Sequence, residues 1–186
     1  PYKKSILPFL DDATRQAQEI SAVNTIRIRR KNKDMHTTGH NTDYLGFMKS
    51  LKPLLQKDMK KALVLGTGGA AGAVKFGLAQ LNIEADFVSG NPKNKDQISY
   101  QEIDQKIIKE HKLIINTTPL GMFPDTGSCP PLPWHYLTAD HLLYDLIYNP
   151  LKTIFLSKAE HAGATIKNGL EMLHIQAEEA WNFWTE

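Results

Sequence analysis

Residues 61–81 read KALVLGTGGAAGAVKFGLAQL, and this stretch decides which kind of fold the chain adopts. The apolar run at 61–65 is typical of a strand that is buried on both faces of a parallel sheet. The glycines behind it fit the pattern G-x-G-x-x-A as Gly66, Gly68 and Ala71. The first glycine permits a tight turn, the second lets the backbone approach a pyrophosphate, and the alanine lets the next helix lie close to the strand. The stretch predicts a dinucleotide-binding turn, with a purely structural turn as the alternative.

The helix that opens at this turn is expected to contribute its first amides to the site. Gly69 and Ala70 stand at its start, where unpaired N–H groups and the helix dipole both favour an anion. We therefore count both residues, together with Gly66, Gly68 and Ala71, among the predicted cofactor-binding residues.

The end of the next strand indicates which dinucleotide is bound. An NAD site usually places an Asp or Glu there to hold the ribose hydroxyls. This chain has Ser89, Gly90 and Asn91 instead, followed by Lys93 and Lys95. The missing acid and the nearby lysines favour the 2′-phosphate of NADP, so we expect Ser89, Asn91 and Lys93 to contact the cofactor. The alternative is that the lysines only belong to a solvated loop.

The rest of the segment from 61 to 168 alternates strands with helices, which predicts an α/β fold with a Rossmann-type, doubly wound parallel sheet. A loop rich in Pro and Gly at 119–133 is longer than a compact domain uses without a function. Further strands are expected at 85–90, 112–118 and 141–148, a short strand or turn at 164–169, and helices near 100–110 and at 151–163.

The first 55 residues follow a different pattern and predict part of a second α/β lobe. We expect a helix at 9–20 capped by Asp11 or Asp12, strands at 21–30 and 35–41 around a turn at 31–34, and a helix at 43–55 that Pro53 ends or bends. The last helix, 169–185, carries a stripe predicted to pack against the protein, made of Leu170, Leu173, Ala177, Trp181 and Trp184.

Composition excludes several classes of protein. The chain of 186 residues has a hydrophobic fraction of 41% and a net charge of +2, which gives no reason to expect binding to nucleic acid. It contains no apolar run long enough to span a bilayer. Cys129 is the single cysteine, and the histidines show no ligand spacing, so we predict no disulfide and no metal site. We expect a cytoplasmic protein.

A polar cluster, GHNTD at 39–43, raises the question of what the carboxylate of Asp43 does. Asp43 opens a segment that otherwise has the pattern of a buried helix. Taken alone it fits an N-cap as well as a functional acid, because Asp is a favoured capping residue. His40 lacks a partner pattern and is better explained as a residue at the rim of a site than as a base.

Seven motifs resemble those of shikimate dehydrogenases, in the same order and spacing along the whole chain. They are PYK, AVNT, GHNTD, GTGGAA, INTTPLGM, YDLIY and NGLEML followed by Gln176. The resemblance implies that 1–55 is the C-terminal part of a substrate-binding domain, that 56–168 is the NADP-binding domain, and that 169–186 is a helix packing back toward the former. It also implies that the chain begins partway through the substrate domain and lacks a serine-bearing segment that grips the substrate carboxylate.

The resemblance assigns roles to single residues. Members of this family interconvert shikimate and 3-dehydroshikimate with NADP, on the route to chorismate and the aromatic amino acids. Lys3 and Asp43 match their catalytic pair, which binds the reacting oxygen and relays its proton. The positions that match substrate contacts are Asn24, Thr42, Tyr148 and Gln176, and those that match cofactor contacts beyond the glycine turn are Thr117 and Gly169.

One departure from the family concerns the cofactor. NADP-dependent members typically have Asn-Arg-Thr where this chain has Ser89, Gly90 and Asn91, so the arginine that pairs with the 2′-phosphate is missing. Two alternatives stay open: a quinate/shikimate dehydrogenase with relaxed substrate and NAD use, and a non-catalytic NADP-binding regulatory domain that kept the fold. We expect a small-molecule substrate, no nucleic acid or membrane partner, and a monomer or homodimer.

Overall fold

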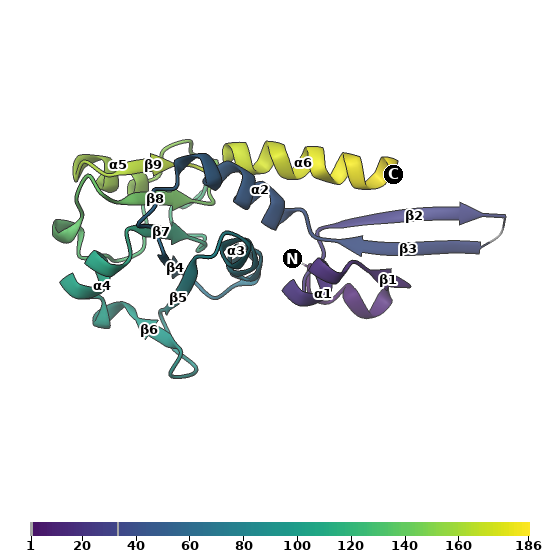
Figure 1. Ribbon diagram of the computed structural model, residues 1–186, viewed down its shortest axis with the longest axis horizontal. Coiled ribbons are helices and arrows are strands. Elements are labelled where there is room, and N and C mark those ends of the chain that lie inside the picture. The colour runs from purple at the N-terminus through teal and green to yellow at the C-terminus, as the bar shows by residue number, and fades with distance from the viewer. Residues whose placement is uncertain (1, 33) are drawn as a thin grey trace.

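The computed structural model describes residues 2–32 and 34–186 and contains two sheets (Figure 1). The larger sheet has six strands in the order β6-β5-β4-β7-β8-β9, and the smaller has three in the order β1-β3-β2. Lys33, which belongs to the predicted turn at 31–34, and Pro1, which belongs to the PYK motif, lie outside the described residues.

The six-stranded sheet is parallel throughout, which confirms the predicted doubly wound α/β fold. The glycine turn leads from its first strand into a long helix, as expected. Its strands are β4 (Lys61–Leu65), β5 (Glu84–Ser89), β6 (Gln97–Ser99), β7 (Leu113–Asn116), β8 (Leu142–Asp145) and β9 (Thr165–Lys167), and the helices between them are α3 (Gly69–Gln80), α4 (Gln105–Glu110) and α5 (Ile154–His161).

Apolar side chains fill both faces of this sheet, because successive residues of a strand point to opposite sides. Val64 lies in a core with α3 and with a helix of the N-terminal lobe, whereas its neighbour Leu63 lies in a second core with α4 and α5. Burial on both sides explains why the strands appear in the sequence as continuous apolar runs.

The N-terminal lobe is built on a long β-hairpin that extends away from the six-stranded sheet (Figure 1). Its elements are β1 (Asp12–Ala13), α1 (Arg15–Ile20), β2 (Thr25–Lys31), β3 (Asp34–His40) and α2 (Asp43–Leu51). The 3-10 turns of the chain are Leu7–Phe9, Lys52–Leu54, Tyr100–Glu102 and Trp134–Tyr136. Helix α2 gives way to the second of these turns, so the prediction that Pro53 ends the helix is confirmed.

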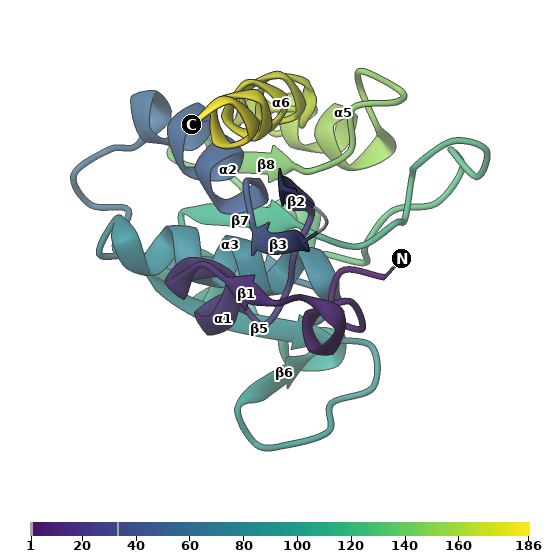
Figure 2. The ribbon, with the colours of Figure 1, turned by 90° about the vertical axis from the view of Figure 1, so that its right-hand side faces the viewer.

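Helix α2 joins the two parts of the molecule. It lies beside α6 (Leu170–Thr185), as Figure 2 shows, and a Cβ atom on Gly46 would be 2.5 Å from the carbonyl oxygen of Met172. Gly77 of α3 is also closely packed, since a Cβ there would lie 2.9 Å from the ring of Phe47. At the far end of α2 the hydroxyls of Ser50 and Tyr144 are 2.7 Å apart, and burial raises the pKa of that phenol. Helix α2 is therefore held on three sides.

Two expectations about secondary structure were wrong. The predicted helix at 9–20 begins only at Arg15 and is capped by Thr14, because Asp11 bonds the backbone and hydroxyl of Thr37 instead. Strand β6 was not predicted, since its three residues are too few to show an alternating pattern.

The predicted packing face of α6 was also wrong. Trp181 and Trp184 are 64% and 51% exposed, while Ala180 and Phe183 are buried. The helix packs through the face that contains Phe183, whose carbonyl accepts a hydrogen bond of 3.2 Å from Arg27 of β2. Apolar residues occupy two faces of this helix, and the buried one is set by where α2 and the hairpin lie.

Candidate active site

The first polar cluster gathers around the start of α2. The ammonium of Lys3 donates to Oδ2 of Asp43, and the amide nitrogen of Asn24 lies 2.9 Å from Oδ1 of the same carboxylate. That nitrogen also lies 3.0 Å from the hydroxyl of Thr42 and 3.1 Å from Oε1 of Gln176. The structure thus brings together five predicted residues from four separate parts of the chain.

The carboxylate of Asp43 is not used as a helix cap. The N-cap position belongs to Thr42, and the side-chain oxygen of Asn41 accepts from the amide of Tyr44 at 3.4 Å. Asn41 is itself fixed because it donates to the carbonyl of Ala22 at 3.0 Å. Asp43 is the first helical residue, where the helix dipole favours its negative charge, and its oxygens remain directed at Lys3 and Asn24.

The local surroundings fix the Lys3–Asp43 pair while leaving the lysine reachable. The carbonyl of Lys3 accepts a hydrogen bond of 2.7 Å from the amide of Val23, which anchors the backbone beside the pair. The side chain of Lys3 is 40% exposed and that of Asp43 is 11% exposed. A partly exposed ammonium next to a mostly buried carboxylate can contact a ligand oxygen and pass a proton to or from it.

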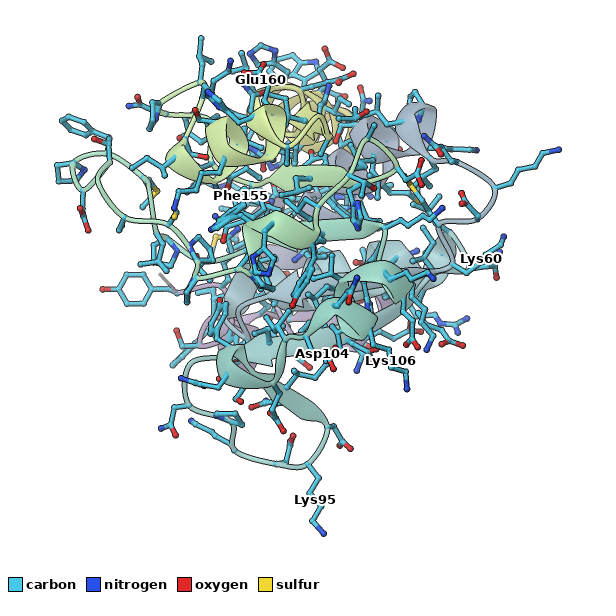
Figure 3. The ribbon with its side chains drawn as sticks, turned by 90° about the vertical axis from the view of Figure 1, so that its left-hand side faces the viewer. Lys60, Lys95, Asp104, Lys106, Phe155 and Glu160 are labelled. Atoms are coloured by element: carbon cyan, nitrogen blue, oxygen red, sulfur yellow. The ribbon has the colours of Figure 1, made fainter. Side chains whose placement is uncertain are left out.

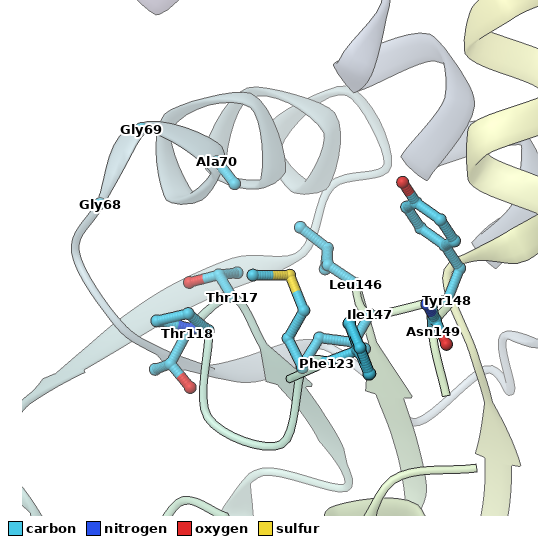
Figure 4. A pocket seen from close by; sticks show the side chains of 12 residues that line it. Gly68, Gly69, Ala70, Thr117, Thr118, Phe123, Leu146, Ile147, Tyr148 and Asn149 are labelled. Atoms are coloured by element: carbon cyan, nitrogen blue, oxygen red, sulfur yellow. The ribbon is translucent and has the colours of Figure 1, made fainter. Parts of the chain in front are cut away.

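A second site lies at the glycine turn, where a cavity of about 500 Å³ opens between the start of α3 and two loops (Figure 4). Gly66 has a φ of +104°, which favours glycine. A Cβ atom on Gly68 or on Gly69 would meet no heavy atom within 4 Å, so the backbone there is open to a ligand. Gly68, Gly69 and Ala70 line the cavity, and Ala71 is buried behind them.

The two loops that complete the cavity, 117–123 and 146–149, were only partly predicted as site residues. Thr117 lines it, although its hydroxyl donates to the carbonyl of Leu65 at 2.8 Å. The cavity also has an apolar lining that was not predicted from the sequence, formed by Met122, Phe123, Leu146 and Ile147. The unusual length of the Pro- and Gly-rich loop was the signal that could have indicated part of this lining.

Tyr148 and Gly169 lie near this cavity rather than in the Lys3–Asp43 cluster. Tyr148 is 46% exposed, lines the cavity and lies on its side nearest α2 and α6 (Figure 4). Gly169 is behind the second loop: its amide donates to the carbonyl of Ile147 at 3.0 Å, and a Cβ atom there would be 2.1 Å from the carbonyl oxygen of Leu146. Close approach of two backbones requires glycine here.

The tip of β5 offers few fixed groups to a phosphate. The hydroxyl of Ser89 accepts from the amide of Asn91 at 3.2 Å, and a Cβ atom on Gly90 would meet nothing within 4 Å. Lys93 stands in the loop that follows, where its amide donates to the side chain of Gln97 at 2.9 Å. Lys95 extends away from the body of the protein (Figure 3). Of the two lysines, Lys93 is nearer in the chain to the tip of the strand.

His40 has a structural environment. One ring nitrogen lies 2.8 Å from the hydroxyl of Thr14, and the ring stacks on Phe183 with centroids 4.8 Å apart. Burial lowers the pKa of the imidazole. In the described part of the chain no group of three His, Cys, Asp or Glu side chains is arranged to hold a metal ion, and no helix is both long and apolar enough to cross a bilayer.

A glycine turn that opens on a cavity, together with a Lys–Asp pair on a separate lobe, defines a dinucleotide-binding α/β protein with a second, polar site. No protein-family model matches the chain. It is 40% identical to a shikimate dehydrogenase (NADP(+)) of Caldicellulosiruptor bescii, over 99% of this chain and 67% of that protein. The chain belongs to the shikimate dehydrogenase family.

Solved structures agree with this assignment. Shikimate 5-dehydrogenase of Thermus thermophilus, in complex with NADP(H) and shikimate, matches with a TM-score of 0.83 and 32% identity, over 100% of this chain and 70% of that one. A quinate dehydrogenase of Corynebacterium glutamicum in complex with NAD matches with a TM-score of 0.85 and 27% identity, over 100% and 70%. The chain spans about two thirds of the length of these relatives.

Proposed function

We propose that this protein catalyses the reversible, NADP-dependent reduction of 3-dehydroshikimate to shikimate, a step on the route to chorismate and the aromatic amino acids. The observation that carries the proposal is the contact between Lys3 and Asp43 inside the cluster with Asn24, in a chain that belongs to this family. A protein that only binds a nucleotide has no need of a proton-carrying pair on a separate lobe.

The pair manages the proton of the reacting oxygen. During reduction, Nζ of Lys3 donates a hydrogen bond to the carbonyl oxygen, stabilises the negative charge that develops there and delivers a proton. The carboxylate of Asp43 holds the ammonium in place and balances its charge. During oxidation the same pair takes the proton of the hydroxyl. NADP, when bound, supplies or accepts the hydride.

Neighbouring amides and hydroxyls hold the substrate ring. The amide nitrogen of Asn24 has two hydrogens for three acceptors, on Thr42, Asp43 and Gln176. These groups can exchange their shared bonds for bonds to ring hydroxyls without leaving a buried donor unpaired. Tyr148 offers a further hydroxyl from the side of the cavity.

The residues of the second site fit a dinucleotide. The open backbone at Gly68 and Gly69 and the first amides of α3 suit a pyrophosphate, and we assign Gly66, Ala70 and Ala71 to the same turn. Ser89, Asn91 and Lys93 are the groups available to a 2′-phosphate. Thr117 borders the cavity and Gly169 supports its second loop, on the side we assign to the nicotinamide. The apolar side chains of the two loops line that end of the cavity.

Assay of the purified full-length protein with each substrate and cofactor tests the proposal. We expect 3-dehydroshikimate and NADPH to be the preferred pair, measured as kcat/KM from the loss of NADPH absorbance. Faster oxidation of quinate with NAD would favour the quinate/shikimate alternative. NADPH binding without turnover would favour the regulatory domain. We place the protein in the cytoplasm. We expect a monomer or homodimer, and size-exclusion chromatography with light scattering would measure the oligomeric state.

A further inference from the structure

Two buried polar side chains face each other beneath the cavity. Asn116 ends β7 and Asp145 ends β8, and the two residues are paired in the register of the parallel sheet. Both are 0% exposed, and the amide nitrogen of Asn116 donates to Oδ1 of Asp145 at 3.1 Å. The carboxyl ends of neighbouring parallel strands are where ligands bind in such sheets, so this pair lies directly below the two cavity loops.

Asn116 holds the beginning of the first loop. Its side-chain oxygen accepts from the amide of Thr118 at 3.0 Å and from the hydroxyl of the same residue at 2.7 Å. Its carbonyl accepts from the amide of Leu146 at 3.1 Å, which is the first residue of the second loop. A single residue thus contacts both loops.

Asp145 holds the second loop and links it to helix α5. Oδ1 accepts from the amide of Ile147 at 3.1 Å, and Oδ2 accepts from the hydroxyl of Thr153 at 2.6 Å. Thr153 is the N-cap of α5. The first loop passes over this threonine, because a Cβ atom on Gly121 would be 3.5 Å from its Cβ.

The chemistry of the pair suits positioning and not proton transfer. A carboxylate offers acceptors only, and the side chain of Asp145 receives three donors. Burial raises the pKa of Asp145 to about 6, although these three hydrogen bonds oppose the shift. Burying a charge is costly, and the proton-carrying Lys3–Asp43 pair does not include this residue. The free-energy cost of burying Asp145 indicates that this side chain has a role in holding the two loops above it.

We propose that Asn116, Asp145 and Thr153 form a buried clamp that holds loops 117–123 and 146–149 in one arrangement, and that Asp145 is a positioning residue for the cofactor cavity. The two loops also meet directly, since the amide of Phe123 donates to the carbonyl of Asn149 at 3.1 Å. The inference that the clamp matters for the cofactor rests on the proposed function. The inference that the clamp couples the two loops does not depend on the proposed function.

Hydrogen exchange of the ligand-free protein tests the coupling. In Asp145→Ala, amides in both loops should exchange about tenfold faster or more, because unpaired buried donors open the local structure. Asp104→Ala is the matched control, since Asp104 caps α4 with a bond of 2.8 Å to Ile107 and does not line the cavity. If Asp145→Ala does not fold, Thr153→Val removes one hydroxyl at nearly constant volume. Faster exchange confined to the second loop would overturn the clamp.

NADPH binding, measured by the fluorescence of its nicotinamide, tests the link to the cofactor. Asn116→Ala and Asp145→Ala should each raise Kd about tenfold, and the double variant should raise it about as much as either alone, because residues of one network are not additive. Asp145→Asn should lie within about threefold of wild type, since its oxygen can still accept from Asn116 and Ile147 while its NH2 donates to the hydroxyl oxygen of Thr153. Additive losses, or values of Kd unchanged in Asp145→Ala, would overturn the inference. A wild type that binds no NADPH would overturn the proposed function, while hydrogen exchange would still decide the coupling.

Discussion

Lys3 and Asp43 form a hydrogen-bonded ion pair although they are 40 positions apart in the chain. The contact depends on the fold of the N-terminal lobe, because the backbone of Lys3 is anchored at Val23 and Asp43 is placed by the start of α2. No other side chain in the described cluster around Asn24 is cationic. The proton chemistry proposed for this protein therefore depends on one ammonium.

Replacing that ammonium should lower turnover more than binding. In the full-length enzyme we expect Lys3→Ala to reduce kcat about 100-fold or more, the usual effect of losing a general acid–base group, with a much smaller change in the KM of the substrate. Lys4→Ala is the matched control, since Lys4 is an exposed neighbour of the same charge. A kcat of Lys3→Ala within about threefold of wild type would contradict the assigned role.

Adding a guanidinium at the tip of β5 should strengthen NADP preference. Gly90 has open space around its missing Cβ, so Gly90→Arg should be accommodated without strain. A bidentate Arg–phosphate pair is worth about 1.5–3 kcal/mol more than none, which is roughly ten- to a hundredfold in affinity. Values of kcat/KM for NADP should rise and those for NAD should stay nearly constant. Gly90→Gln separates charge from bulk, and an equal gain for NADP in that variant would show that charge is not the cause.

Gly169 should tolerate no side chain. A Cβ atom there would lie 2.1 Å from the carbonyl oxygen of Leu146, and overpacking of this kind costs about 1–3 kcal/mol. We expect Gly169→Ala to unfold at lower urea concentration and to bind NADPH more weakly. At Gly127 a Cβ atom would meet nothing closer than 4.0 Å, so Gly127→Ala is the control. Equal stability of the two variants would mean that the backbone contact is not required.

The buried carboxylate of Asp145 should give the protein a distinctive pH dependence. Burial raises the pKa of Asp145 from 3.8 to about 6, so the folded state binds more protons than the unfolded state between these values. The contribution of Asp145 to stability is therefore complete below pH 3.8 and is lost as the pH rises through about 6. Asp145→Asn lacks this titration. Its free energy of unfolding relative to wild type should rise on the order of 1–3 kcal/mol across that window. A constant difference between pH 4 and pH 7 in urea unfolding would contradict the shifted pKa.

Local sequence patterns predicted the doubly wound parallel sheet, without its edge strand β6, because the signals of its other strands are local. A buried strand appears as a short apolar run, and the turn between β4 and α3 requires glycine at Gly66 for its positive φ. Strand β6 escaped prediction because three edge residues show no periodicity. The packing face of α6 was predicted wrongly for another reason. Trp181 and Phe183 are both apolar, and the sequence does not indicate which of them α2 and the hairpin cover.

Local sequence patterns predicted less of the candidate site than of the sheet. Nothing in the spacing of Lys3 and Asp43 indicates that they meet, and only the resemblance to a family suggested it. Asn116 and Asp145 appear in the sequence as polar residues at the ends of apolar strands, and their pairing follows from the order in which strands lie in the sheet. The apolar lining of the cavity comes from loops, whose shape depends on the contacts beneath them.

The length of helix α2 fixes the distance and the rotation between the residues at its two ends. Its nine residues run from Asp43, at the proton-carrying pair, to Leu51, one residue beyond the serine bonded to Tyr144 of the sheet. At 1.5 Å per residue the helix is about 13 Å long. Inserting one residue would turn Asp43 by about 100° relative to Ser50, away from Lys3. A change in the length of the hairpin or of the loop at 119–133 would leave this spacing intact, whereas a change in the length of α2 would not.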